Sequence, residues 1–176
     1  MNLKKIIISG APGTGKSSII KELKTQGYYC FEEVWDKKYE NPSNKYNIDD
    51  INTFSQNIFD KRLQQLKYKK TEKIKDNIIF YDRSIIDTIA YLKKYKKNIN
   101  PDWIKKGLNK RYSQTIFLCP LWKKIYKQNN RRKETYEESL VIEKFLTSTY
   151  KEFLYKIQLI PKLDIIDRVN YILNTI

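Results

Sequence analysis

Short apolar runs alternate with longer stretches of mixed polar and apolar residues along the whole chain. The apolar runs cover residues 5–9, 28–31, 77–81, 115–119 and 157–160, and their length is typical of buried strands. Between them, apolar residues recur at three- and four-residue intervals, which predicts helices over 16–26, 49–75, 84–95, 101–110, 136–155 and 164–173. A basic helix is also expected over 120–127, whereas the polar, turn-rich residues 32–47 are expected to form a loop.

The order of these elements indicates the class of fold. Short strands that alternate with helices favour a parallel sheet covered by helices on both faces. At 176 residues, the chain is expected to be one three-layer α/β domain over 1–176. Right-handed crossovers bring the carboxyl ends of all the strands to one edge, so site residues should follow Ser9, Phe31, Tyr81, Cys119 and Ile160.

A phosphate-binding motif stands at the first of these strand ends. Residues 10–17 read G-A-P-G-T-G-K-S, the full G-x-x-x-x-G-K-[ST] P-loop, between an apolar strand and a helix. Its glycines let the backbone curl so that N–H groups point at phosphate oxygens, and the helix adds the positive end of its dipole. The motif predicts a P-loop NTPase fold and a site for ATP and Mg²⁺ built from Gly10, Ala11, Pro12, Gly13, Thr14, Gly15, Lys16, Ser17 and Ser18.

Four charged or polar side chains are expected to act around this loop. Lys16 should reach the β- and γ-phosphates, and the Ser17 hydroxyl should bind Mg²⁺. Asp82, at the end of the third strand, is expected to hold the same ion directly or through water, and Arg83 to direct its guanidinium at a phosphate or at the substrate. The alternative is that Asp82 or Ser84 only caps the next helix.

Other strand ends carry further candidate residues. One of the adjacent carboxylates Glu32 and Glu33 could act as the base toward an acceptor hydroxyl, and the alternative is a solvated loop acid. Asp87 and Tyr91 share a helix face and either line the acceptor pocket or lie at the surface.

The basic segment after the fourth strand is expected to form a helical lid, at about 121–136. Such a lid would close over the triphosphate, and Arg131 or Arg132 would then neutralise charge that develops during transfer. The alternative is a solvated basic face.

The composition narrows the chemistry. The chain contains no histidine, so proton transfer must fall to carboxylates or water. Cys30 and Cys119 lie in apolar surroundings, which indicates reduced core residues rather than metal ligands or a disulfide. No apolar run reaches the roughly 18 residues of a membrane span, and the first strand begins too early for a signal peptide, so a cytoplasmic location is expected.

The net charge of +15 bears on partners. Lysine, isoleucine, asparagine and tyrosine are all frequent, as codon bias would produce, and the resulting surface would simply be coated with lysine. The alternative is attraction to a polyanion such as nucleic acid, an acidic membrane surface or an acidic partner. Nucleic acid is weakly supported, since the sequence has no recognisable nucleic-acid-binding motif.

Taken together, these motifs resemble one family over residues 5–172. It is an AAA domain family of predicted ATPases, within the P-loop kinase-like group, that includes the ribosylnicotinamide kinase domain of the bacterial NAD regulator. The most specific part is I-F-L-C-P-L-W at 116–122, followed by Ile125-Tyr126, Arg131-Arg132 and Tyr136-Glu137-Glu138. The resemblance implies the strand order 2-3-1-4-5.

A looser similarity connects the chain with deoxynucleoside and thymidylate kinases, which also carry an acid-arginine motif like Asp82-Arg83-Ser84. Deoxynucleoside kinases place a catalytic glutamate in Glu-Pro-Val after the second strand. The similarity therefore favours Glu33 over Glu32, although Val34 follows Glu33 here without the proline.

Two classes of function follow. One is a kinase that moves the γ-phosphoryl group of Mg-ATP to a small nucleoside- or nucleotide-like acceptor. The other is a regulatory NTPase switch that acts through a protein or nucleic-acid partner. GTP specificity of the G-protein type is disfavoured, because residues 109–112 read N-K-R-Y and lack the aspartate of N-K-x-D.

Overall fold

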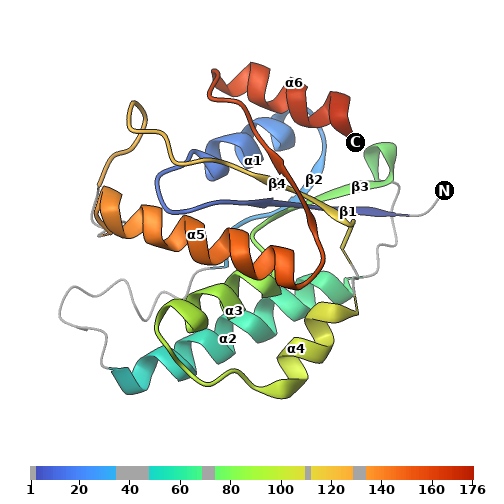
Figure 1. Cartoon of the computed structure of the whole chain (residues 1–176). Helices are drawn as coiled ribbons and strands as arrows, with labels where there is room; N and C mark the ends of the chain where they lie inside the picture. Colours follow the sequence, from blue (N-terminus) through green and yellow to red (C-terminus); the bar gives the residue numbers. More distant parts are fainter. Residues whose placement is uncertain (1–2, 35–47, 69–73, 110–111, 129–133) are drawn as a thin grey trace.

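The computed structural model describes residues 3–34, 48–68, 74–109, 112–128 and 134–176. Its five-stranded sheet comprises β1 (Lys4–Ser9), β2 (Tyr29–Phe31), β3 (Ile78–Asp82), β4 (Thr115–Leu118) and β5 (Lys156–Leu159). The strands lie in the order β2-β3-β1-β4-β5, and every neighbouring pair is parallel (Figure 1). The strand order implied by the family resemblance is therefore confirmed.

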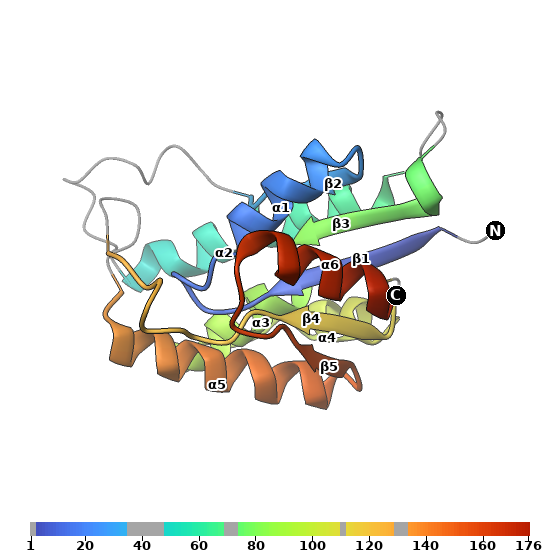
Figure 2. The same ribbon diagram turned by 90° about the horizontal axis from the view of Figure 1, so that it is seen from above.

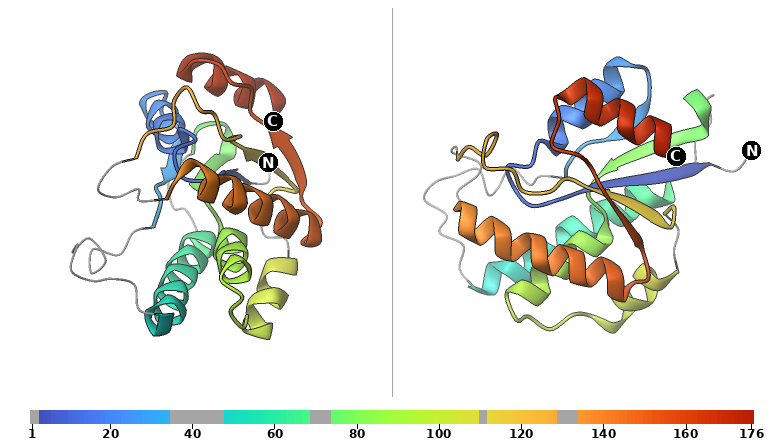
Figure 3. Two further views of the ribbon diagram at one scale, coloured as in Figure 1. Left: turned by 60° about the vertical axis from the view of Figure 1, so that its left-hand side comes forward. Right: turned by 45° about the horizontal axis from the view of Figure 1, so that its top comes forward.

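Helices cover both faces of the sheet, which confirms the three-layer α/β prediction. On one face lie α1 (Lys16–Thr25) and α6 (Ile165–Thr175), which contact each other. On the other lie α2 (Ile48–Lys67), α3 (Ile85–Lys94), α4 (Pro101–Leu108) and α5 (Tyr136–Glu152) (Figures 1 and 3). In the described parts of the chain, no helix is both long and apolar enough to cross a membrane.

The strands are apolar at nearly every position because both faces of the sheet are buried. In β1, Ile7 packs into the core under α2, α3 and α5, whereas Ile6 and Ile8 pack into the core under α1 and α6. Residues of β3 divide between the same two cores in the same alternating way. This period of two on a sheet covered from both sides produces the continuous apolar runs of the sequence.

The carboxyl ends of the strands lie on the side opposite the N-terminus (Figure 2). The register pairs Ile8 of β1 with Asp82 of β3, so the loops after these two strands start side by side. Two backbone hydrogen bonds extend the pairing past the strand ends: Arg83 N donates to Ile8 O at 3.0 Å, and Cys119 N donates to Ser9 O at 2.8 Å. The sheet thus places the loops that follow β3 and β4 next to the P-loop.

Most predicted helices start and end within about three residues of those observed, but two predictions are wrong. The helix expected to reach Lys75 ends at Lys67. Tyr68 then stacks on Tyr29 of β2, with ring centroids 5.4 Å apart, and a single 3₁₀ turn at Lys75–Asn77 precedes β3. The packing of the Tyr68 ring against β2 takes the place of a further helical turn at this point.

The basic lid is not helical in its described part. Between Pro120 and Gln128 the chain makes only one turn, closed by bonds from Ile125 N and Tyr126 N to Trp122 O. A helix this short does not offset the cost of its first turn unless an apolar face packs on the protein, and this segment is rich in lysine. Residues 129–133 of the expected lid lie outside the described residues.

Candidate active site

The P-loop backbone adopts conformations that require glycine at two positions. Gly10 and Gly15 have φ values of 146° and 84°. A Cβ atom on Gly10 would lie 2.5 Å from the carbonyl oxygen of Cys119, and one on Gly15 would lie 2.7 Å from Nη1 of Arg168. The helix that follows, α1, has no side-chain cap, so its first N–H groups are free to bind an anion.

Lys16 is buried at this loop and points back along it. Its ammonium group donates to the carbonyl oxygen of Ala11 at 2.9 Å. Burial, together with the nearby charge of Arg83, lowers the pKa of Lys16 to about 8, against the opposing effect of Asp82. A phosphate at this position would supply the negative charge that favours the protonated form, so Lys16 fits a phosphate-binding role.

Ser17 and Asp82, the predicted metal ligands, lie together. The Ser17 hydroxyl donates to Oδ2 of Asp82 at 3.3 Å, and the other carboxylate oxygen, Oδ1, is buried without a partner in the described structure. Burial, with the neighbouring charge of Glu33, raises the pKa of Asp82 to about 6. An orphaned carboxylate oxygen beside a hydroxyl fits a hard cation such as Mg²⁺.

This pair alone does not form a complete cage for a metal. The described residues hold no cluster of three or more His, Cys, Asp or Glu side chains that could bind an ion. Mg²⁺ typically keeps several waters and takes one or two carboxylates plus substrate phosphates, and Ser17 with Asp82 suits that mode.

Arg83 and Glu33 form an ion pair beside Asp82. Arg83 has a left-handed backbone with φ of 71°, and its buried side chain donates from Nε to Glu33 Oε1 at 2.5 Å. Burial opposes ionisation of Glu33, but the charges of Arg83 and Lys16 prevail and hold its pKa at about 2. The structure therefore brings together Lys16, Glu33, Asp82 and Arg83 from three loops, as the sequence predicted.

A buried hydrogen-bond network centred on Asp87 lies next to these site residues. Asp87 accepts from the Ser9 hydroxyl at 2.6 Å, the Tyr150 hydroxyl at 2.5 Å and the Ser84 backbone N–H at 2.8 Å. Arg83 Nη1 lies 3.5 Å from the same carboxylate. Asp87 is thus a buried support for the site, neither a wall of an acceptor pocket nor a surface residue.

The capping alternative holds for one of its two residues. Ser84 caps α3, since its hydroxyl accepts from the Ile86 backbone N–H at 3.1 Å, and Asp87 completes a capping box. Asp82 takes no part in this cap. Capping therefore explains Ser84 but leaves Asp82 available to the site.

Sequence reasoning missed Arg62, a buried residue of α2. Its Nη1 donates to the Ser84 carbonyl oxygen at 3.1 Å and to the Thr88 hydroxyl at 2.9 Å, and its Nε has no partner in the described structure. Arg62 lies 22 residues before Ser84, within a helix whose pattern only indicates burial. A charged residue among apolar helical positions was the available signal.

An open groove lies beside the Glu33–Arg83 pair. It has a volume of about 560 Å³ and lies between the end of β2 and α2. Its described lining is Phe31, Glu32, Glu33, Val34, Lys61, Gln64, Gln65 and Tyr68. The groove combines aromatic, amide and charged side chains, which are the groups that typically bind a small polar ring compound.

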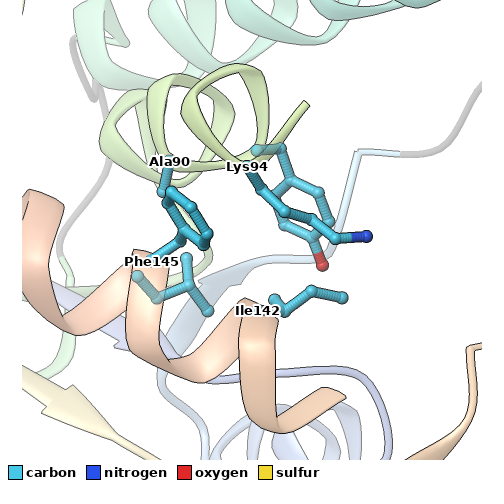
Figure 4. Close-up of a pocket in the computed structure, with 6 residues that line it drawn as sticks. Ala90, Lys94, Ile142 and Phe145 are labelled. Atoms are coloured by element: carbon cyan, nitrogen blue, oxygen red, sulfur yellow. The ribbon is translucent and has the colours of Figure 1, made fainter. Parts of the chain in front are cut away.

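A second, shallow pocket lies between α3 and α5 (Figure 4). It is lined by Ala90, Tyr91, Lys94, Ile142, Phe145 and Leu146. Lys94 is the one charged group among these residues, and most of the lining is carbon. This pocket is therefore a weaker candidate for phosphate chemistry than the strand-end site.

Only part of the predicted lid lies within the described residues. Arg131 and Arg132 lie outside the described residues. The preceding segment contacts the P-loop, because the side chain of Ile125 lies 3.5 Å from the position of a Cβ on Gly15. Leu121 N donates to Glu143 of α5 at 2.5 Å, which anchors the start of the segment.

The fold and site geometry define a P-loop protein with a nucleoside and nucleotide kinase-like fold. A family model described as AAA domain matches residues 5–168. The chain therefore belongs to this AAA domain family, as the sequence motifs predicted. None of the curated proteins is significantly similar to it in sequence.

Several solved structures share the fold. Deoxyadenosine kinase from M. mycoides with bound dATP has a TM-score of 0.65 and 20% sequence identity, with 97% of this chain and 98% of that chain covered. Thymidylate kinase from Ehrlichia chaffeensis has a TM-score of 0.59 and 16% identity, with 99% of each chain covered. NadR protein in complex with NR has a TM-score of 0.68 and 18% identity, with 97% of this chain and 50% of that chain covered.

Proposed function

We propose that this protein is an ATP-dependent phosphotransferase that moves the γ-phosphoryl group of Mg-ATP to a small nucleoside- or nucleotide-like acceptor. The observation that carries the proposal is the position of Glu33, which lines the open groove and forms an ion pair with the buried Arg83. A phosphate-binding site alone would suit any NTPase. A carboxylate in the wall of a groove, held in place by a guanidinium, is what a second substrate requires.

On the ATP side, the roles of the described residues rest on their contacts. The P-loop N–H groups and Lys16 bind the triphosphate, and Ser17 with Asp82 would hold Mg²⁺. The bound ion would neutralise charge on the phosphate oxygens. Arg131 and Arg132 are proposed to add positive charge from the lid during transfer.

On the acceptor side, Glu33 is proposed to accept the proton of an acceptor hydroxyl. A carboxylate with a pKa near 2 is a weak base, but phosphoryl transfer has a loose transition state, so orientation of the hydroxyl matters more than base strength. Arg83 orients Glu33 through their 2.5 Å contact and can direct its remaining N–H groups at the acceptor or the phosphoryl group.

Similar structures support the acceptor class. The deoxyadenosine kinase of M. mycoides has been solved with dATP, and also with the products dCMP and dCDP. The NadR structure contains NR. These ligands share a ribose or deoxyribose carrying a ring, and the groove beside Glu33 offers Phe31 and Tyr68 for stacking and Gln64 and Gln65 for hydrogen bonds.

The test measures ADP release from Mg-ATP with and without nucleosides, nucleotides and ribosylnicotinamide. Stimulation by one acceptor, with a phosphorylated product and loss in Lys16→Ala, is expected. Glu33→Gln should lower transfer to that acceptor by about 10²-fold or more. The matched control is Glu152→Gln, because Glu152 at the C-terminal end of α5 is 55% exposed, pairs with Lys93 and does not line the groove, and transfer should be nearly unchanged.

Slow hydrolysis that no acceptor changes, with equal rates for Glu33→Gln and Glu152→Gln, would contradict the kinase proposal. That result would favour the regulatory NTPase switch, for which partner-stimulated hydrolysis without a phosphorylated product is the signature.

A further inference from the structure

A buried arginine from the C-terminal helix contacts the P-loop. Arg168 of α6 is only 2% exposed, and its Nη2 donates to the carbonyl oxygen of Thr14 at 2.9 Å. Its Nη1 lies 2.7 Å from the position that a Cβ on Gly15 would take. The guanidinium therefore packs directly against the part of the loop that precedes Lys16.

The charge of Arg168 is not balanced by an acid in the described structure. No ion pair of Arg168 is present among the described residues. Its Nε and Nη1 are buried there without an oxygen or nitrogen partner, and the thiol of Cys119 lies beside the guanidinium. A buried cation is costly unless it is paired, so a residue that only joined α6 to the core would serve better as an apolar one. The negative charge of a nucleotide bound on the other side of the loop would compensate this buried, unpaired guanidinium.

The contact with Thr14 also sets the direction of an N–H group. The described peptide bonds are trans, and in a trans peptide the carbonyl and the next N–H point in opposite directions. Since Arg168 holds the Thr14 carbonyl oxygen on the side of α6, the Gly15 N–H is turned away from α6. Gly15 is one of the residues whose N–H groups the motif uses to bind phosphate.

We propose that Arg168 is a positioning residue of the nucleotide site. It fixes the Thr14–Gly15 peptide so that the Gly15 N–H faces the phosphates, and the bound triphosphate compensates its buried charge. This inference rests on the ATP site of the proposed function, but it requires only nucleotide binding and no phosphoryl transfer.

The test compares Arg168→Met and Arg168→Lys with a control on the same helix, Val169→Ala. Val169 is fully buried in the core between α6 and the sheet, so its truncation loosens α6 without removing the contact with the loop. Mg-ATP binding is measured by calorimetry, stability of the nucleotide-free protein by thermal unfolding, and the Gly15 amide by its ¹H–¹⁵N signal.

The proposal expects three results. Arg168→Met weakens Mg-ATP binding by about tenfold or more, the scale of one lost charge-assisted contact, and moves the Gly15 signal. Arg168→Lys keeps the charge but not the planar fork, and falls between Arg168→Met and the unmodified protein. Thermal unfolding of the nucleotide-free Arg168→Met protein is unchanged or occurs at higher temperature, whereas Val169→Ala unfolds earlier and keeps its affinity.

Binding of Mg-ATP by Arg168→Met within about twofold of the unmodified protein, or an unmoved Gly15 signal, would overturn the proposal. So would a loss of affinity that Val169→Ala reproduces at equal loss of stability. A protein that binds Mg-ATP through Arg168 but phosphorylates no acceptor would refute the kinase function and leave this inference intact.

Discussion

Replacement of Asp87 by asparagine should destabilise the protein strongly, although the two side chains have nearly the same shape. Asp87 is fully buried, and its carboxylate accepts hydrogen bonds from Ser9, from Tyr150 and from the N–H and hydroxyl of Ser84. An asparagine amide has one acceptor oxygen and one NH₂ group. The NH₂ group must face donors that the second carboxylate oxygen now accepts.

The magnitude follows from the number of donors left without an acceptor. Oδ1 accepts from Ser9, whereas Oδ2 accepts from Ser84 and Tyr150, so either orientation of the amide leaves at least one buried donor unsatisfied. Each unsatisfied buried group costs about 1–3 kcal/mol, and the loss of charge weakens the remaining bonds. The free energy of unfolding should therefore fall by about 3–5 kcal/mol.

Urea unfolding followed by tryptophan fluorescence measures this change. Trp103 is a suitable reporter, because it is buried and stacks on Phe59 with ring centroids 3.9 Å apart. The control is Asp102→Asn on α4, since Asp102 is largely exposed and should change stability by only about 0.5 kcal/mol. Equal stabilities of the two variants would refute the description of Asp87 as the acceptor that holds this network together.

Three further predictions concern particular residues. Because burial raises the pKa of Asp82 from its usual 3.8 to about 6, its charge opposes folding above pH 6 and no longer does so below about pH 4. Asp82→Asn should therefore raise the free energy of unfolding of the nucleotide-free protein at pH 8, by at most about 3 kcal/mol, and the difference should shrink as the pH falls through 6 in urea titrations. Gly107→Ala should destabilise α4 even though alanine favours helices, because the new Cβ would lie 2.4 Å from a ring carbon of Phe153; a rise in the thermal midpoint would contradict this packing. Leu154 is 60% exposed and has a φ of 60°, a left-handed conformation that glycine adopts without strain. Leu154→Gly should therefore raise the free energy of unfolding, measured in urea, by about 0.5–1 kcal/mol, whereas Leu154→Ala should not.

Local patterns predicted most of the sheet and the P-loop. The apolar runs located all the described strands to within about two residues, because a strand buried on both faces must be apolar at successive positions. The glycines of residues 10–17 likewise predicted a phosphate-binding loop, since φ values such as 146° at Gly10 leave little choice of residue. The strand ends then predicted the meeting of Lys16, Asp82 and Arg83.

The same patterns were misleading where packing overrides them. The pattern of the sequence favours a helix that continues past Lys67 and another over the basic segment after β4, yet Tyr68, directly after α2, and residues 120–128 are not α-helical. Helix formation near residue 68 gives way to the stacking of Tyr68 on Tyr29, and the segment after β4 follows the P-loop and α5 instead. Tertiary contacts decided these segments because a short helix without a packed face is marginal.

The apolar pattern and the P-loop motif were enough to predict the class of fold, the P-loop and the edge of the sheet at which the candidate site lies. Which distant side chains support that edge follows only from how the layers pack: Asp87 with Tyr150, 63 residues apart, and Arg168 with Thr14, 154 residues apart. Strand periodicity and loop glycines act over a few neighbouring residues, so strands and loops can be predicted from short stretches of the sequence. A buried polar contact between distant residues depends on how whole layers pack. Neither residue of such a pair is accompanied by a local pattern that identifies its partner.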